Sequence, residues 1–296
     1  MRMLYPSNKS IKFYIRRLWD TQKNIEAEEK WALKKEEHEK KIRKNKLKYF
    51  MNVKTSISKV RSLSIWIFIV PFISINLCLI LTVYLHCLPG GTQCLDGSYT
   101  LIPKEFRLYN TFPYFDGGAS ISRTARFLPN SIIFKLSMFF TSFCLIKYWL
   151  YNKKIIIFLN NGHKYTKKII FFGIFSAVML ALHSAFLGFD FNNDFYKLFR
   201  RVVLLSFIIF EIVAQTYLVL ILYSIKDKLT NLINFKILKL KLILVSILIA
   251  IAVFTLPFLN SNSHKLIKHA LEWNYFIGVI GFYFLTFLMW KNNKKN

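Results

Sequence analysis

Residues 202–223 read VVLLSFIIFEIVAQTYLVLILY, and this stretch decides the fold class. It holds a single charged side chain, Glu211, and is about as long as the ~20 residues that an α-helix needs to cross the hydrocarbon core of a membrane. The run is continuously apolar and lacks the alternation of a transmembrane β-strand. It therefore predicts a membrane-spanning helix.

Five further apolar runs of similar length lie along the chain. Together the six expected spans are 63–85, 131–151, 169–189, 202–223, 238–259 and 270–290. Hydrophobic residues make up 54% of the 296 residues and Phe alone occurs 30 times, which is more apolar surface than a soluble domain of this size hides. Disorder requires low hydrophobicity, and four cysteines are too few for a disulfide-stapled module.

These observations predict an all-α fold, a polytopic transmembrane helical bundle of six spans. We expect three parts along the chain. A basic, partly helical cytosolic tail occupies residues 1–61, the six-span domain occupies 62–291, and a short cytosolic tail occupies 292–296. The first apolar run begins near Leu63, too late and too long for a secretory signal peptide, so we interpret it as a span that stays in the membrane.

Positive charge is distributed unevenly between the segments that connect the spans. The two tails and the connections after the second and fourth spans, with their immediate flanks, hold 31 Lys and Arg residues, whereas the other connections hold 9. Lys and Arg are retained on the cytosolic side, so both termini are expected in the cytosol, in a bacterial inner membrane or an endomembrane. Four tryptophans lie near span ends and are expected to be interfacial anchors: Trp66, Trp149, Trp273 and Trp290.

The N-terminal tail is strongly basic, with 18 Lys and Arg against 7 Asp and Glu in residues 1–63. The pairs Glu26–Lys30 and Glu36–Lys40 are four residues apart, a spacing that predicts a solvated helix. Such a helix either lies on anionic lipid headgroups or binds a protein partner, and the sequence leaves both open. Nucleic acid is not an expected partner, because no recognisable nucleic-acid-binding module is present.

The first outside connection, residues 87–130, is the largest and contains two features of interest. Cys87 and Cys94 flank a Pro-Gly-Gly sequence, so they form either a disulfide in an oxidising compartment or two unpaired thiols. The second feature is FPYFDGGASISRTAR, residues 112–126, in which Asp116 precedes hydroxyl and guanidinium groups. These groups belong to Ser120, Ser122, Arg123 and Arg126. They either hold a phosphate or form a structured loop in which Asp116 pairs with one of the two arginines.

The fourth span carries the sharpest signal, because Glu211 lies near the bilayer centre, where an acid is costly and usually faces the bundle interior. Gln215 is one turn further along, and Arg200, eleven residues earlier, returns to the same helical face. We therefore expect a polar stripe of Arg200, Glu211 and Gln215. Its interpretation stays open between a proton or lipid-headgroup site and a structural interhelical hydrogen bond.

Two further ionisable residues lie in the spans. His183, near the outer end of the third span, is either a hydrogen-bonded packing residue or a catalytic group. Glu272 opens the sixth span from the outside. If the bundle brings them together, an outside-facing pocket contains His183, Glu211, Glu272 and the loop arginines as ligand-binding candidates.

Known enzyme motifs are absent from the sequence, which has no GxSxG, no HExxH and no phosphate-binding P-loop. No set of His and Cys has zinc-site spacing, so neither a metal nor a cofactor is expected. We favour a non-enzymatic protein. Two alternatives remain: a membrane-embedded hydrolase or acyltransferase that uses His183 and Glu211, and a proton-coupled transporter that uses Glu211.

The order of these features resembles that of the six-span FRAG/DRAM/SFK group. This group includes the damage-regulated autophagy modulators and the Golgi protein that remodels the lipid of GPI anchors. The resemblance spans about residues 62–291 and rests on the large first loop, on 112–123 within it, and on Leu271-Glu272-Trp273 at the start of the last span. The Ser that precedes the family's Asp is absent before Asp116. The resemblance implies a role in membrane lipid organisation or trafficking, with membrane lipids as partners and no catalytic residues to carry over.

Overall fold

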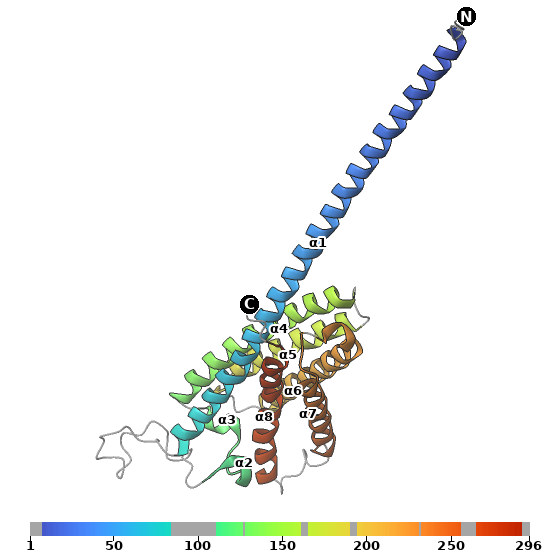
Figure 1. Ribbon diagram of the computed structural model, residues 1–296. Coiled ribbons are helices and arrows are strands. Elements are labelled where there is room, and N and C mark those ends of the chain that lie inside the picture. Colours follow the sequence, from blue (N-terminus) through green and yellow to red (C-terminus); the bar gives the residue numbers. More distant parts are fainter. Residues whose placement is uncertain are drawn as a thin grey trace, which may run out of the picture. The chain divides into compact units, whose positions relative to one another are not determined.

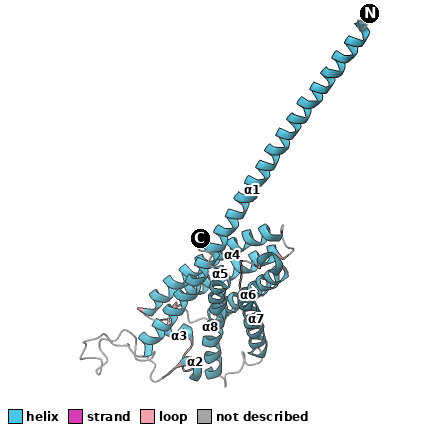
Figure 2. Cartoon of the chain, viewed as in Figure 1, coloured by secondary structure: helices cyan, strands magenta, loops and turns pink. Residues whose placement is uncertain are grey.

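The computed structural model describes residues 8–83, 111–126, 128–160, 165–189, 194–230, 232–255 and 265–291. The chain divides into two units, Met1–Lys54 and Thr55–Asn296. Within the described ranges the regular secondary structure is helical, with one isolated β-bridge between Ile233 and Trp290 (Figure 2). The all-α prediction is therefore confirmed.

One helix, α1 (Asn8–Val83), contains both the described part of the tail and the first candidate span. In the tail, Lys40 Nζ lies 2.7 Å from Glu36 Oε1, which confirms the expected ion pair. The hydrogen bond and the charge of Lys40 lower the pKa of the Glu36 carboxyl. Both side chains are exposed, so the pair contributes little to stability. The other expected pair, Glu26–Lys30, is not described, because the side chain of Glu26 lies outside the described residues.

Six helices among the described residues are long and apolar enough to cross a membrane. After α1 they are α4 (Asn130–Asn160), α5 (Thr166–Phe186), α6 (Asp194–Ser224), α7 (Phe235–Thr255) and α8 (Lys265–Met289). Each overlaps one of the six predicted runs. Large apolar side chains on their outer faces are exposed, among them Leu136 and Phe254, as expected for surfaces that contact lipid tails.

Helix α5 packs against α4 and α6, and α7 packs against both α6 and α8 (Figure 1). The close approach of α4 and α5 depends on Gly173, because a Cβ there would lie 2.4 Å from Cδ2 of Trp149. Trp149, Trp273 and Trp290 are buried, so the expectation that they anchor at the interface is wrong. Each of the three fills space between elements of the bundle, whereas Trp66 is half exposed as an anchor should be.

The bundle has two chemically distinct ends. One, here called the lysine end, carries the lysines of the connections α4–α5 and α6–α7 and of their flanks: Lys153, Lys154, Lys167, Lys168, Lys226, Lys228, Lys236 and Lys239. It includes the short 3-10 helix η3 (Lys226–Leu229). Its backbone is closed by two hydrogen bonds, from Asn234 N to Met289 O at 2.9 Å and from Lys291 N to Leu232 O at 3.0 Å.

The opposite end, here called the loop end, carries the short helices α2 (Pro113–Asp116) and α3 (Ile121–Thr124), which lie beside the first turns of α8 (Figure 1). Asn130 at the start of α4 is fully buried and joins three segments there. Its Nδ2 donates to Thr124 O at 2.7 Å, to Thr82 Oγ1 at 2.9 Å and to Cys78 O at 3.0 Å.

Candidate functional site

Glu211 lies at the centre of a hydrogen-bonded network in the bundle core and is 0% exposed. Ser176 Oγ of α5 lies 2.6 Å from its Oε2 atom. Its Oε1 atom accepts hydrogen bonds from Gln215 Nε2, at 3.0 Å, and from the hydroxyl of Tyr283 on α8. The expected placement of Glu211 and Gln215 on one face is therefore present, and the acid joins α5, α6 and α8.

A second set of hydrogen bonds, which includes Lys241 of α7, lies beside this one toward the lysine end and meets it through a ring contact. Lys241 is also 0% exposed, and its Nζ donates to Thr286 Oγ1 at 2.7 Å and lies 3.8 Å from the centre of the Phe282 ring. Thr286 Oγ1 is 3.5 Å from the hydroxyl of Tyr148, whose ring packs edge-on against that of Tyr283 at 5.0 Å. We call these residues the core network: Tyr148, Ser176, Glu211, Gln215, Lys241, Tyr283 and Thr286.

Arg200 does not belong to the core network. Eleven residues of α-helix rise about 16 Å, so a shared face leaves Arg200 beyond hydrogen-bonding reach of Glu211. Arg200 lies instead beside His183, whose ring hydrogen-bonds to the Arg200 backbone and whose Nδ1 atom has no hydrogen-bond partner. The structure thus brings His183 and Arg200 together at the loop end and keeps Glu211 and Gln215 apart from them.

The loop of residues 111–126 is organised by Asp116. Its carboxylate accepts hydrogen bonds from Phe112 N at 2.7 Å and from Thr111 Oγ1 and Gly118 N, both at 2.8 Å. Desolvation raises the pKa of Asp116, but these donors together outweigh it, and the net effect lowers the pKa. Asp116 therefore closes the loop on its own backbone.

The hydroxyl and guanidinium candidates lie on α3 and its flanks. Ser120 caps α3 by accepting a hydrogen bond from Arg123 N at 3.2 Å, and its hydroxyl lies 3.2 Å from that of Ser122. The buried Nε atom of Arg126 has no hydrogen-bond partner within the described part of the chain. Ser120 is thus engaged in holding the backbone, while Arg126 retains a donor.

Helix α8 holds this loop through a row of side chains on its first three turns. His269 Nδ1 lies 3.0 Å from Gly117 O, and Trp273 Nε1 donates to Ala119 O at 2.8 Å. Asn274 Nδ2 donates to Tyr114 O at 2.8 Å, and the Glu272 carboxylate accepts from the backbone N–H groups of Ile121 and Ser122. We call this set of contacts the loop dock. It places the 112–123 segment directly against Leu271-Glu272-Trp273.

Gly117 is what permits so close an approach. Its φ of +64° is a left-handed conformation that favours glycine, and a Cβ there would lie 1.7 Å from the carbonyl oxygen of Leu266. Tyr114 extends the dock to α1, because its hydroxyl donates to Asn76 Oδ1 at 3.0 Å. Burial raises the pKa of Tyr114, and the bond to Asn76 offsets part of that rise.

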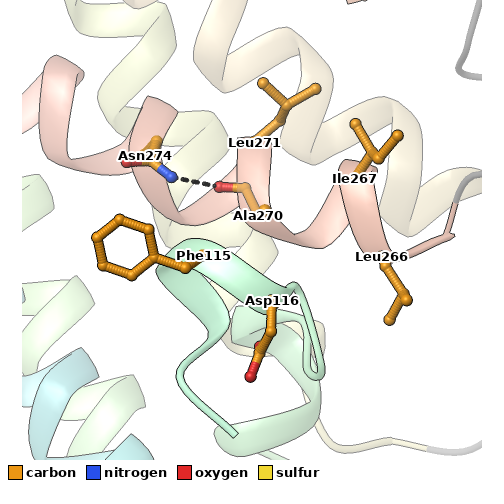
Figure 3. Close-up of a pocket in the computed structure, with 7 residues that line it drawn as sticks. All are labelled: Phe115, Asp116, Leu266, Ile267, Ala270, Leu271 and Asn274. Atoms are coloured by element: carbon orange, nitrogen blue, oxygen red, sulfur yellow. Dashed lines mark hydrogen bonds between the residues drawn. The ribbon is translucent and has the colours of Figure 1, made fainter.

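An open groove of about 350 Å³ runs between α2 and the first turns of α8 (Figure 3). Its lining is mostly apolar: Phe115, Asp116, Leu266, Ile267, Ala270, Leu271 and Asn274. Figure 3 shows the Asp116 carboxylate directed away from α8 and the Asn274 amide turned back to the carbonyl of Ala270. Phe115 and Asp116 thus face the first turns of α8 across a surface groove at the end of a spanning helix.

Glu211 and Glu272 belong to different sites, since one lies in the core network and the other holds α3. The outside-facing pocket that would contain both is therefore not formed by the described side chains. Cys87 and Cys94 lie outside the described residues. In the described ranges no group of three His, Cys, Asp or Glu could hold a metal ion.

The fold and the composition define a polytopic, integral membrane helical protein. Comparisons of the chain with protein-family models, with curated proteins and with solved structures found no match.

Proposed function

We propose that this chain is a non-enzymatic membrane protein that handles membrane lipid, and that the groove between α2 and α8 holds part of a lipid molecule. The groove is the observation that carries the proposal. Its lining from α8 is apolar except for Asn274, and Leu266 and Ile267 are 62% and 54% exposed. An acyl chain covers such side chains favourably, because apolar area is removed from contact with polar groups.

The position of the groove supports a lipid ligand. Lys265–Met289 is a candidate span, and Leu266, Ala270 and Asn274 lie on its first turns, where a spanning helix meets the headgroup region. Phe115 is 85% exposed at the rim, as aromatic side chains at a membrane interface commonly are.

The resemblance to the FRAG/DRAM/SFK group supports the same role. The residues that carry it are the ones that the loop dock joins, namely the 112–123 segment and Leu271-Glu272-Trp273. Three residues of these segments, Phe115, Asp116 and Leu271, line the groove.

The charge pattern supports an orientation in which both termini and the lysine end face the cytosol and the loop end faces the opposite side. In this orientation the lysines contact anionic headgroups, and the basic tail (1–61) is available to a protein partner. A bacterial inner membrane and an endomembrane fit this orientation equally well.

The contacts of His183 and Glu211 favour binding over the hydrolase or acyltransferase alternative. An acid–base pair must reach one substrate. His183 contacts Arg200, whereas Glu211 is enclosed by Ser176, Gln215 and Tyr283.

The test uses the full chain in lipid nanodiscs that contain a spin-labelled phospholipid. Ala270→Trp fills the groove, so we expect a smaller fraction of motionally restricted lipid than in the wild type. Leu136→Trp is the matched control, because Leu136 is exposed on the first turns of α4 at the same end of the bundle. Equal restricted fractions in wild type and Ala270→Trp would contradict the proposal.

A further inference from the structure

The bundle core contains a fully buried acid and a fully buried amine that the proposed lipid groove does not use. Glu211 and Lys241 are both 0% exposed, and the side chains around Glu211 come from α5, α6 and α8. A lipid headgroup cannot reach a carboxyl group that is enclosed in this way. The ligand that fits is as small as a proton.

The hydrogen bonds of Ser176 indicate where such a proton lies. The Ser176 hydroxyl is 2.6 Å from Glu211 Oε2 and 2.9 Å from Gly173 O. A hydroxyl has one hydrogen and donates only once. When Oε2 carries a proton, Glu211 donates to Ser176 and Ser176 donates to Gly173, so both contacts are hydrogen bonds. An ionised carboxylate takes the serine hydrogen and leaves the contact with Gly173 unfilled.

The other carboxyl oxygen agrees with this assignment. Glu211 Oε1 accepts from Gln215 and from Tyr283, which suits the carbonyl oxygen of a neutral acid with its two lone pairs. These partners and Ser176 are uncharged. A buried carboxylate without a contacting cation is unfavourable, and a membrane-embedded core increases that cost.

We propose that Glu211 is a proton-binding site, occupied in the structure. Loss of this proton leaves a carboxylate among uncharged partners. The buried amine of Lys241 has contacts of its own, to Thr286 Oγ1 at 2.7 Å and to the face of the Phe282 ring.

The side chains around Glu211 come from α4, α5, α6 and α8. The titratable neighbours are Tyr148 of α4 and Tyr283 of α8, while α5 supplies Ser176 and α6 supplies Gln215. Toward the loop end, the next titratable group on α5 is His183, seven residues or about 10 Å along the helix from Ser176.

The experiment is infrared spectroscopy of the full chain in nanodiscs across a pH series, in light and heavy water. A protonated carboxyl gives a C=O stretching band above the amide region that shifts in heavy water, whereas the ester bands of the lipid do not shift. In the difference between the wild-type and Glu211→Gln spectra at neutral pH we expect one such band. In Ser176→Ala this band should move to higher frequency, because the acid loses its acceptor. Glu36→Gln, which removes an exposed carboxylate, is the matched control and keeps the band.

Wild-type and Glu211→Gln spectra with the same band in this region overturn the proton site. Glu211→Gln copies the shape of the neutral acid, and its unchanged size-exclusion profile shows that band loss is not unfolding.

Discussion

Gly117→Ala is expected to detach the 111–126 loop from α8. The new methyl group would lie 1.7 Å from the carbonyl oxygen of Leu266, which is backbone and cannot rotate away. In addition, alanine at a φ of +64° is less favourable than glycine by about 1 kcal/mol, because its Cβ strains the left-handed backbone. The loop must therefore move, and it then loses its hydrogen bonds to His269, Trp273 and Asn274, each worth about 1 kcal/mol.

Together these terms place the docked loop about 3–5 kcal/mol higher in free energy. Limited trypsin digestion measures this, because Arg123 and Arg126 lie in the docked segment. A free-energy change of this size raises the population of the open loop, and so the cleavage rate, by about 100-fold or more. The matched control is Gly281→Ala, since a Cβ at Gly281 meets nothing within 4 Å. Cleavage of Gly117→Ala at the wild-type rate would refute the reasoning.

Three further predictions concern the bundle and the loop. Gly173→Ala forces a methyl group to 2.4 Å from the Trp149 ring and should lower the free energy of unfolding by about 1–3 kcal/mol, measured by thermal unfolding in detergent; an unchanged Tm contradicts it. Asn130→Ala removes a buried donor to three acceptors and should cost about 2–4 kcal/mol in the same assay. Since the folded-state pKa of Asp116 is lowered, its carboxylate stabilises the loop above the ordinary Asp pKa, and this contribution is lost as the pH falls through the lowered value. Pepsin cleavage of residues 111–126 should therefore rise with acidification relative to Asp116→Asn, and parallel pH profiles would contradict this.

Hydrophobicity was sufficient to predict the six spans, because crossing a membrane demands a long apolar run whatever the helices pack against. The same information could not predict the burial of Trp149, Trp273 and Trp290. Position near a span end is common to an interfacial anchor and to a residue that fills a gap between helices. Only the neighbouring helix distinguishes the two.

Helical periodicity correctly placed Glu211 and Gln215 together but overextended the stripe to Arg200. A common face ensures alignment, while contact also requires proximity along the axis, and eleven residues rise about 16 Å. The count of 31 Lys and Arg residues on the cytosolic side includes Lys241 with the connection after the fourth span, although Lys241 is fully buried. A lysine that lies inside an apolar run was the signal that could have identified it.

The loop dock shows what long-range packing adds. The sequence singled out 112–126 and Glu272, yet they are about 150 residues apart, and their pairing depends on the approach of Gly117 to Leu266. For Ser120 the sequence left phosphate binding and a structured loop open, because serine hydroxyls serve helix N-termini and ligands equally well, and its hydroxyl caps α3.

A comparison of cellular lipids tests the central claim most directly. Cells that lack the protein would be complemented with wild type, Ala270→Trp or Leu136→Trp at matched expression. The account predicts that one lipid class changes without the protein, that wild type and Leu136→Trp restore it, and that Ala270→Trp does not. A lipid composition that is unchanged without the protein, or that Ala270→Trp restores fully, would contradict a lipid-handling role for the groove.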